Sequence, residues 1–223
     1  MSIMVETFPA VAFGGLFQNA FIGRVSDLDV TVERETALAR LEQYHQQARN
    51  DLEFGHMTFI TAKQIHGDGV AVVDATTQSP VAGADALVTN APNVCLGIYV
   101  ADCCAVYAVD TANGAIGLAH SGKKGTELGV IPAMLKKMAC AFGTDPGQVI
   151  VQLSPCIRPP LYEVDFAAEI VRQCRAMGVG EVVDSGDCTG QNLERYYSYR
   201  LEKGRTGRML ALLALTGRSR TVD

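Results

Sequence analysis

Residues 104–119 read CAVYAVDTANGAIGLA, and this stretch decides the fold. Two apolar runs flank Asn113-Gly114, and Asn-Gly between apolar runs is the strongest short signal for a β-hairpin. The stretch therefore predicts antiparallel strands over 104–109 and 115–119. A two-residue loop would pair residue 112 with 115, whereas a four-residue loop would pair 110 with 115.

A thiol and an imidazole flank this hairpin at its open end. Cys103 precedes the first strand and His120 follows the second. The residue opposite Cys103 is 122 in one register and 124 in the other, and His120 is an even number of residues from both. Because side chains alternate along a strand, either register places the two side chains on one face. A thiolate and an imidazole so placed can hold a metal or form a nucleophile–base pair.

Composition predicts one globular domain over residues 1–223. The chain is 48% hydrophobic and 19% charged, enough apolar residue to bury a sizeable core. With a net charge of -5, the chain has no excess of positive charge, which argues against nucleic-acid binding. No apolar run reaches the length of a membrane span. The seven cysteines form no Cys-x-x-Cys pair, and no signal peptide is recognisable, so we expect a cytoplasmic protein with reduced thiols.

The remaining pattern predicts an α/β fold with a mixed sheet and outer helices. Alternation predicts strands within 1–24 and over 57–64, 70–74, 86–89, 94–101 and 148–153. Helical spacing predicts helices over 33–49, 126–142, 165–177 and roughly 191–202, while 208–215 fits a strand or a helix. In the first helix, His45 is expected on the polar, solvated side.

A second histidine lies in a setting typical of functional residues. His66 stands in Lys63-Gln64-Ile65-His66-Gly67, at a predicted strand end and before a glycine that lets the backbone turn. His66, Cys103 and His120 with an open fourth position would have the composition of a catalytic zinc site. A single histidine or cysteine is more often structural, so the residues alone leave a metal site, a Cys–His pair and core packing all open.

Several short motifs together resemble a known family. They are Lys63-Gln64-Ile65-His66-Gly67, Asp85-Ala86-Leu87-Val88-Thr89, Ala101-Asp102-Cys103, Ala119-His120-Ser121-Gly122, Pro155-Cys156-Ile157, Tyr162-Glu163-Val164, Cys188-Thr189, Tyr197-Ser198-Tyr199-Arg200 and Thr206-Gly207-Arg208. Their order and spacing resemble the polyphenol oxidase/laccase-domain family, also called the peptidoglycan-editing factor or purine nucleoside phosphorylase family. The resemblance is good over roughly residues 55–210 and weak over the first 50.

The resemblance carries expectations about fold and chemistry. It implies an α/β domain of layered sheets and outer helices, as in the laccase-domain and CNF-toxin-like cysteine hydrolase fold. It implies a zinc site formed by His66, Cys103 and His120. The implied activities are phosphorolysis of adenosine, inosine, guanosine and methylthioadenosine, and deamination of adenosine, so nucleoside and phosphate are the expected partners. Members have also been described as copper-dependent phenol oxidases, and a Cys/His₂ site suits copper as well as zinc.

This chain departs from the family pattern beside His120. The family motif continues Ala-Gly-Trp-Arg-Gly, whereas this chain has Ser121-Gly122-Lys123-Lys124-Gly125. Lys124 keeps the positive charge of the arginine but loses its planar, bidentate fork. The proline two residues after the family cysteine is Ala105 here, and the early Thr-Arg-x-Gly-Gly-x-Ser segment is reduced to Phe13-Gly14-Gly15. The chain therefore resembles a divergent member.

Further residues are candidates for binding the substrate. Lys123, Lys124 and Arg200 are candidates for donating hydrogen bonds to phosphate. The alternative is that they are charged surface residues solvated by water. Tyr162 would stack on a base or pack, and Gln64, together with Ser121, would orient metal ligands by hydrogen bonds. Asp102 would relay protons or act as a structural hydrogen-bond acceptor, and alternation points it away from Cys103.

Two other functions stay open. In a metal-free cysteine hydrolase, Cys103 would be the nucleophile and His120 the base. In a family member that has lost its catalytic activity, the metal would only stabilise the fold, or the protein would bind a partner or ligand without turnover.

Overall fold

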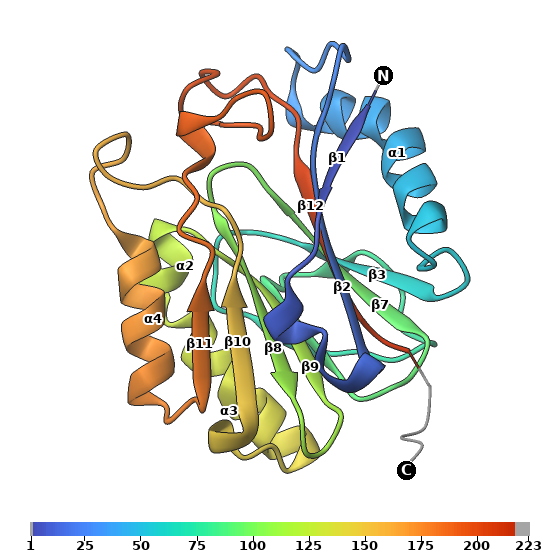
Figure 1. Cartoon of the computed structure of the whole chain (residues 1–223), viewed down its shortest axis with the longest axis vertical. Helices are drawn as coiled ribbons and strands as arrows, with labels where there is room; N and C mark the ends of the chain where they lie inside the picture. The colour runs from blue at the N-terminus through green and yellow to red at the C-terminus, as the bar shows by residue number, and fades with distance from the viewer. Residues whose placement is uncertain (1, 217–223) are drawn as a thin grey trace.

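The computed structural model describes residues 2–216 and shows two six-stranded mixed sheets packed face to face, with helices outside them (Figure 1). This arrangement confirms the layered α/β fold that the sequence predicts. Within residues 2–216, no helix is both long and apolar enough to cross a membrane.

The first sheet has the strand order β1-β2-β12-β7-β3-β5. Its strands are β1 (Ile3–Glu6), β2 (Phe17–Val25), β12 (Met209–Leu215), β7 (Val94–Val100), β3 (Thr58–Lys63) and β5 (Val81–Ala82). Only the contacts of β7 with β3 and of β3 with β5 are parallel. The segment 208–215, for which the sequence allows a strand or a helix, is thus a central strand.

The second sheet has the order β11-β10-β8-β9-β6-β4. Its strands are β11 (Glu181–Asp184), β10 (Val149–Leu153), β8 (Cys104–Asp110), β9 (Ile116–Ser121), β6 (Ala86–Thr89) and β4 (Val70–Val72). The predicted hairpin forms β8 and β9 at the centre of this sheet.

In the part of the chain that the structure describes, four α-helices pack around the two sheets. They are α1 (Arg34–Asp51), α2 (Lys123–Leu128), α3 (Val130–Phe142) and α4 (Phe166–Ala176). The helix α1 lies beside the first sheet, and α3 and α4 cover the outer face of the second (Figure 1). The largest apolar cluster lies between the sheets and includes Phe21 and Leu96 from the first sheet and Tyr107 and Leu118 from the second.

The register of the hairpin follows the four-residue loop. Asp110 and Ala115 are joined by a backbone hydrogen bond, and Ala105 lies opposite His120. The Asp110 carboxylate accepts hydrogen bonds from the backbone N–H groups of residues 112 and 113, and Gly114 supplies the positive φ that the turn requires. Ala105 belongs to the cluster between the sheets, so the face shared by Ala105 and His120 points toward the first sheet.

Two helix predictions are corrected by the structure. The predicted helix over 126–142 is two helices, because Gly129 adopts φ 84 and ends α2. The segment predicted as a helix over 191–202 forms turns after a short 3₁₀-helix at Thr189–Gln191. It keeps isolated backbone turns, such as Tyr196 N–H to Asn192 O, while other backbone groups bond to side chains, as when Arg200 N–H donates to Asp102.

His45 is fully buried, contrary to the prediction that it is solvated. Its neighbours at helical spacing, Leu41 and Ala48, are also buried, so His45 lies on the inner face of α1. The prediction was wrong because it placed Tyr44 in the apolar stripe instead. The His45 ring packs 5.8 Å from the ring of Tyr99.

Candidate metal centre

The structure brings His66, Cys103 and His120 together. One donor atom from each lies within 4.8 Å of the others, and the His66 and His120 rings meet edge to face with centroids 4.7 Å apart. Among residues 2–216, this is the one group of His, Cys, Asp or Glu side chains so arranged. The three donors come from three segments that meet at one end of the sheets: the loop after β3, the turn between β7 and β8, and the end of β9.

Cys103 is held by a turn that crosses from the first sheet to the second. Asp102 in this turn has φ 80, a left-handed conformation that is uncommon outside glycine. Its buried carboxylate accepts hydrogen bonds from Thr189 Oγ1 at 2.7 Å, Ser198 Oγ at 3.0 Å and Arg200 N at 2.7 Å. Asp102 is therefore a structural acceptor that fixes the position of Cys103, which was one of its two predicted roles.

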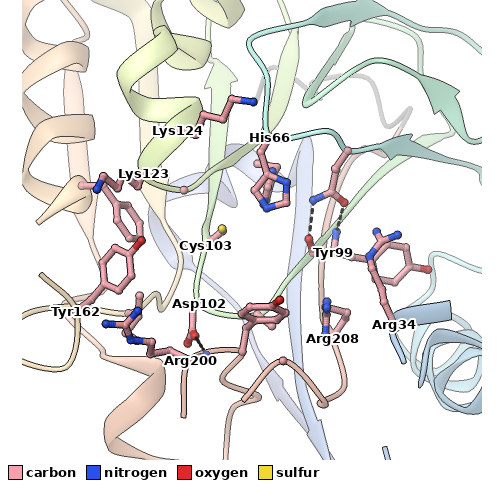
Figure 2. Close-up of a pocket in the computed structure, with 18 of the residues that line it drawn as sticks. Arg34, His66, Tyr99, Asp102, Cys103, Lys123, Lys124, Tyr162, Arg200 and Arg208 are labelled. Carbon is pink, nitrogen blue, oxygen red and sulfur yellow. Dashed lines mark hydrogen bonds between the residues drawn. The ribbon is translucent and has the colours of Figure 1, made fainter. Parts of the chain in front are cut away.

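His66 lies in a loop that is tied to a buried carboxylate. Asp85 accepts hydrogen bonds from the backbone N–H groups of Ile65, His66 and Gly67 at 2.8–3.1 Å. His66 has φ 59, so the loop needs such external support. The His66 side chain is exposed and faces the cavity (Figure 2).

The same carboxylate orients His120. Asp85 Oδ1 lies 2.9 Å from His120 Nδ1, and both side chains are buried. A hydrogen bond from Nδ1 to Asp85 leaves Nε2 as the nitrogen that is free to bind a metal. Sequence reasoning quoted Asp85 within a motif but gave it no role, because the residue lies 35 positions from His120. A carboxylate immediately before a buried apolar strand was the available signal.

Electrostatics favour a thiolate at this point. Burial alone would raise the pKa of Cys103, but the neighbouring His120 and His66 outweigh it and lower that pKa to about 6. Burial would likewise lower the pKa of His120, but Cys103 and Asp85 raise it to about 9. Hydrogen bonds from His120 and the 65–67 loop outweigh burial at Asp85 and hold the pKa of its carboxyl below the usual range. These shifts favour a thiolate at Cys103 beside a protonated His120 when no metal is bound.

Gly122 leaves room for the sulfur. A Cβ atom at this position would collide with Cys103 Sγ, so only glycine permits the thiol to sit against the start of α2. Close by, Ser121 bonds to Thr126 Oγ1 at 2.8 Å and so fixes the first turn of α2. The segment in which this chain departs from the family pattern thus still shapes the site.

The donors open into a cavity of about 980 Å³. The predicted substrate residues Lys123, Lys124, Arg200, Tyr162 and Gln64 all line it. Figure 2 labels the first four of them. Lys123 and Lys124 are exposed. The cavity is also lined by residues that the sequence analysis did not single out for binding: Arg34, Tyr99, Tyr199, Lys203 and Arg208.

Contacts distinguish these lining residues. Arg200 pairs with Glu163 at 3.3 Å and lies 5.5 Å from the centre of the Tyr162 ring. Tyr162 in turn packs edge to face on Phe166, and its phenol lies near the cavity. Both atoms of the Gln64 amide bond to the backbone of Tyr99, at 2.7 and 3.1 Å, which ties the end of β3 to β7.

The donor set fits a metal ion. Two imidazoles and one thiolate are ligands that suit zinc and copper, and three protein ligands with an open side are typical of a catalytic rather than a structural site. The Asp85–His120 hydrogen bond is the support that metal-binding histidines ordinarily have.

Comparison with known proteins agrees with this architecture. The profile of the family described as multi-copper polyphenol oxidoreductase laccase matches residues 14–174 and 164–216. A purine nucleoside phosphorylase of Streptomyces coelicolor is 31% identical over 66% of this chain and 70% of its own length. A purine nucleoside phosphorylase of Deinococcus radiodurans is 33% identical over 75% and 74%, respectively.

A solved structure shows the same fold. YlmD from Geobacillus stearothermophilus superimposes with a TM-score of 0.81 over 93% of this chain and 94% of that one, at 22% sequence identity. The profile match spans nearly the whole described chain, and most of the motifs that carry the resemblance contribute residues to the lining of one cavity. The chain therefore belongs to the multi-copper polyphenol oxidoreductase laccase family.

Proposed function

We propose that the protein is a zinc-dependent purine nucleoside phosphorylase that also deaminates adenosine. The observation that carries the proposal is the cluster of His66, Cys103 and His120 at the wall of a cavity of about 980 Å³. A cavity of this size holds a nucleoside together with phosphate. Relatives named purine nucleoside phosphorylases, which this chain matches over 70–74% of their length, support the choice of reaction.

The residues of the chain have distinct tasks in this reaction. His66, Cys103 and His120 would hold the ion, and Asp85 keeps the imidazole of His120 in the orientation required. A zinc ion held there supplies Lewis acidity, which lowers the pKa of water and stabilises developing negative charge. Tyr162 offers an aromatic face to a base, and cations around the cavity attract phosphate.

Phosphorolysis exchanges one bond to the ribose for another. A phosphate oxygen forms a bond to C1′ as the bond between C1′ and the purine nitrogen breaks. The electron pair of that bond leaves with the purine, and a purine ring nitrogen takes up the proton that the attacking hydrogen phosphate gives up. The products are a purine base and ribose 1-phosphate.

The test combines elemental analysis with nucleoside assays. Purified protein should carry close to one zinc per chain and convert at least one of adenosine, inosine, guanosine and methylthioadenosine with phosphate. Cys103→Ala should lose both metal and turnover. Cys140→Ala, at an exposed cysteine on α3, is the matched control and should keep both. Stoichiometric zinc retained in Cys103→Ala would sink the metal assignment.

The lowered pKa of Cys103 favours a second candidate, a metal-free cysteine hydrolase. In that enzyme the Cys103 thiolate would attack the substrate as nucleophile, and His120 would act as the base. Purified protein that contains no metal and is rapidly alkylated at Cys103 by iodoacetamide would favour this candidate. Zinc-loaded protein in which Cys103 resists alkylation until a chelator is added would favour the phosphorylase.

Two more assays address the other readings of the family. Oxidation of phenols by copper-loaded but not zinc-loaded protein would identify copper as the working metal. Thermal stabilisation by nucleosides without turnover would identify a ligand-binding member.

A further inference from the structure

Two arginines line one side of the cavity. Figure 2 places Arg34 and Arg208 beside Tyr99, with Cys103 and His66 between them and the opposite side, where Tyr162, Lys123 and Arg200 lie. The metal centre therefore lies between two differently equipped halves of one cavity. Tyr162 and the paired Arg200 lie on one side, whereas Arg34 and Arg208 lie on the other, together with Tyr99 and with Tyr199, whose ring centre is 5.8 Å from the Arg208 guanidinium.

Arg208 is a buried cation with no acidic partner. Only 8% of the residue is exposed, and within residues 2–216 no carboxylate lies within ion-pair distance of it. Its Nη1 donates to the carbonyls of Thr206 and Gly207, and the other guanidinium nitrogens have no hydrogen-bond partner among these residues. The next residue, Met209, pairs with Val100, so Arg208 stands next to the turn that carries Cys103. These nitrogens are not among the fully buried atoms that lack a partner, so they are open to the cavity, where an arriving anion can accept their hydrogen bonds.

Arg34 adds a second positive charge to the same place. It is the first residue of α1 and is exposed, and no described carboxylate pairs with it. The adjacent Glu33 pairs instead with Arg205 at 3.6 Å. Burial, followed by the charge of Arg34, lowers the pKa of Arg208, so the two guanidinium groups repel each other. The first backbone N–H groups of the 18-residue helix α1 lack a side-chain cap and add positive potential.

The other cations around the cavity lack this combination. Glu163 already neutralises Arg200, and Lys123 and Lys124 are exposed, where water solvates a lysine ammonium well. In a chain with a net charge of -5, Arg34 and Arg208 place two guanidinium groups without a carboxylate partner on one side of the cavity, and one of them is buried. Two guanidinium forks are also the donors that best match phosphate geometry.

We propose that Arg34, Arg208 and the first turn of α1 form a subsite for a phosphate dianion, with the nucleoside on the Tyr162 side of the metal centre. The proposal rests on the proposed function and deepens it, because it assigns the phosphate to a side of the cavity that the sequence did not indicate. The phosphate group is that of free inorganic phosphate or the 5′-phosphate of a nucleotide, and the two present the same chemistry to the arginines.

The test compares three arginine variants in the zinc-loaded protein. Arg34→Gln and Arg208→Gln should weaken binding of inorganic phosphate roughly 10- to 100-fold in isothermal titration calorimetry, since each removes charge-assisted hydrogen bonds. Adenosine binding in phosphate-free buffer should be unchanged in Arg34→Gln. Arg40→Gln is the matched control, because Arg40 is exposed on the same helix, pairs with Asp29 and does not line the cavity. Should Arg208→Gln fold poorly, Arg34→Gln decides the test alone.

Adenosine 5′-monophosphate separates the two sources of phosphate. If it binds more tightly than adenosine and Arg34→Gln removes the gain, the subsite takes the phosphate of a nucleotide. If it gains nothing while inorganic phosphate binds, the subsite takes free phosphate. Either result supports the subsite, whereas equal affinities of wild type and Arg34→Gln for both probes overturn it.

Kinetics keep the two proposals apart. If wild-type protein binds phosphate through Arg34 but converts no nucleoside, the proposed subsite is supported and the proposed phosphorylase function is refuted. If wild-type protein phosphorolyses nucleosides and its KM for phosphate equals that of Arg34→Gln, the proposed function is supported and the proposed subsite is refuted.

Discussion

A single buried carboxylate ties two of the three candidate metal ligands together. Asp85 accepts hydrogen bonds from His120 Nδ1 and from three consecutive backbone N–H groups around His66. The ion would thus meet donors that are already oriented, which reduces the conformational entropy lost on binding. The arrangement makes Asp85 a positioning residue, although it does not belong to the donor set.

Asp85→Asn should therefore weaken zinc binding by about 10- to 100-fold. Asparagine offers one carbonyl oxygen in place of two carboxylate oxygens and directs N–H groups at donors that need an acceptor. Competition with a chromophoric chelator measures the affinity. Asp68→Asn, at an exposed residue of the same loop, is the control and should bind zinc as wild type does. Equal affinity in Asp85→Asn and wild type would refute the positioning role.

Individual residues show which kinds of contact the sequence could predict. Cys103 and His120 were placed on one face correctly, because a hairpin converts sequence spacing directly into spatial position. The link between Asp85 and His120 joins two segments through tertiary packing, so spacing carries no trace of it. His66 was recognised as a candidate from its strand-end glycine motif, but only the fold brings it to the other two.

At the scale of elements, the segment from 189 to 202 is held by side-chain hydrogen bonds together with isolated backbone turns, and it forms no continuous helix. Thr189, Ser198 and Arg200 all donate to the carboxylate of Asp102. Ser, Thr and Asp side chains offer the backbone alternatives to a helix, which is why a helical pattern alone predicted this segment wrongly. The same bonds hold the turn before Cys103, so the segment and the candidate site depend on one residue.

Asp102→Ala should destabilise the protein by at least about 3 kcal/mol, because three donors, two of them on buried side chains, lose their acceptor. Chemical denaturation measured by circular dichroism gives the free energy of unfolding. Asp187→Ala, at an exposed carboxylate near the same segment, should change that free energy by no more than about 0.5 kcal/mol. A cost for Asp102→Ala as small as that of Asp187→Ala would show that the segment is held by other contacts.

At the scale of the whole molecule, the candidate site lies where the chain passes between the two sheets. The turn from β7 to β8 and the loop from β3 to β4 both cross at this end, and β9 ends there. Local pattern predicted most strands to within two residues, since β6 and β10 are strongly apolar. The order of strands in the two sheets depends on which apolar faces pack together. The pattern of a single sequence does not predict that packing.

The buried His45 couples the stability of the whole fold to pH. Burial, followed by the charge of Arg49, lowers the pKa of His45 to about 4 from an ordinary value near 6.5, while the Arg208 backbone offsets part of this effect. The unfolded chain therefore binds a proton that the folded protein rejects. The contribution of His45 to stability is complete above pH 6.5 and is lost as the pH falls toward 4, by about 3 kcal/mol in total.

His45→Leu should remove this dependence, because leucine fills a similar volume and has no titrating group. The free energy of unfolding is measured from pH 7 to pH 4 with a chelator present, so that metal release does not contribute. The pKa of Cys103 is lowered to about 6, so its contribution to stability is lost mainly as the pH falls toward 6. This loss is the same in both proteins. The difference between wild type and variant thus isolates His45, and wild type should lose stability relative to His45→Leu as the pH falls from 6.5 toward 4. Parallel curves would show that folding does not lower the pKa of His45.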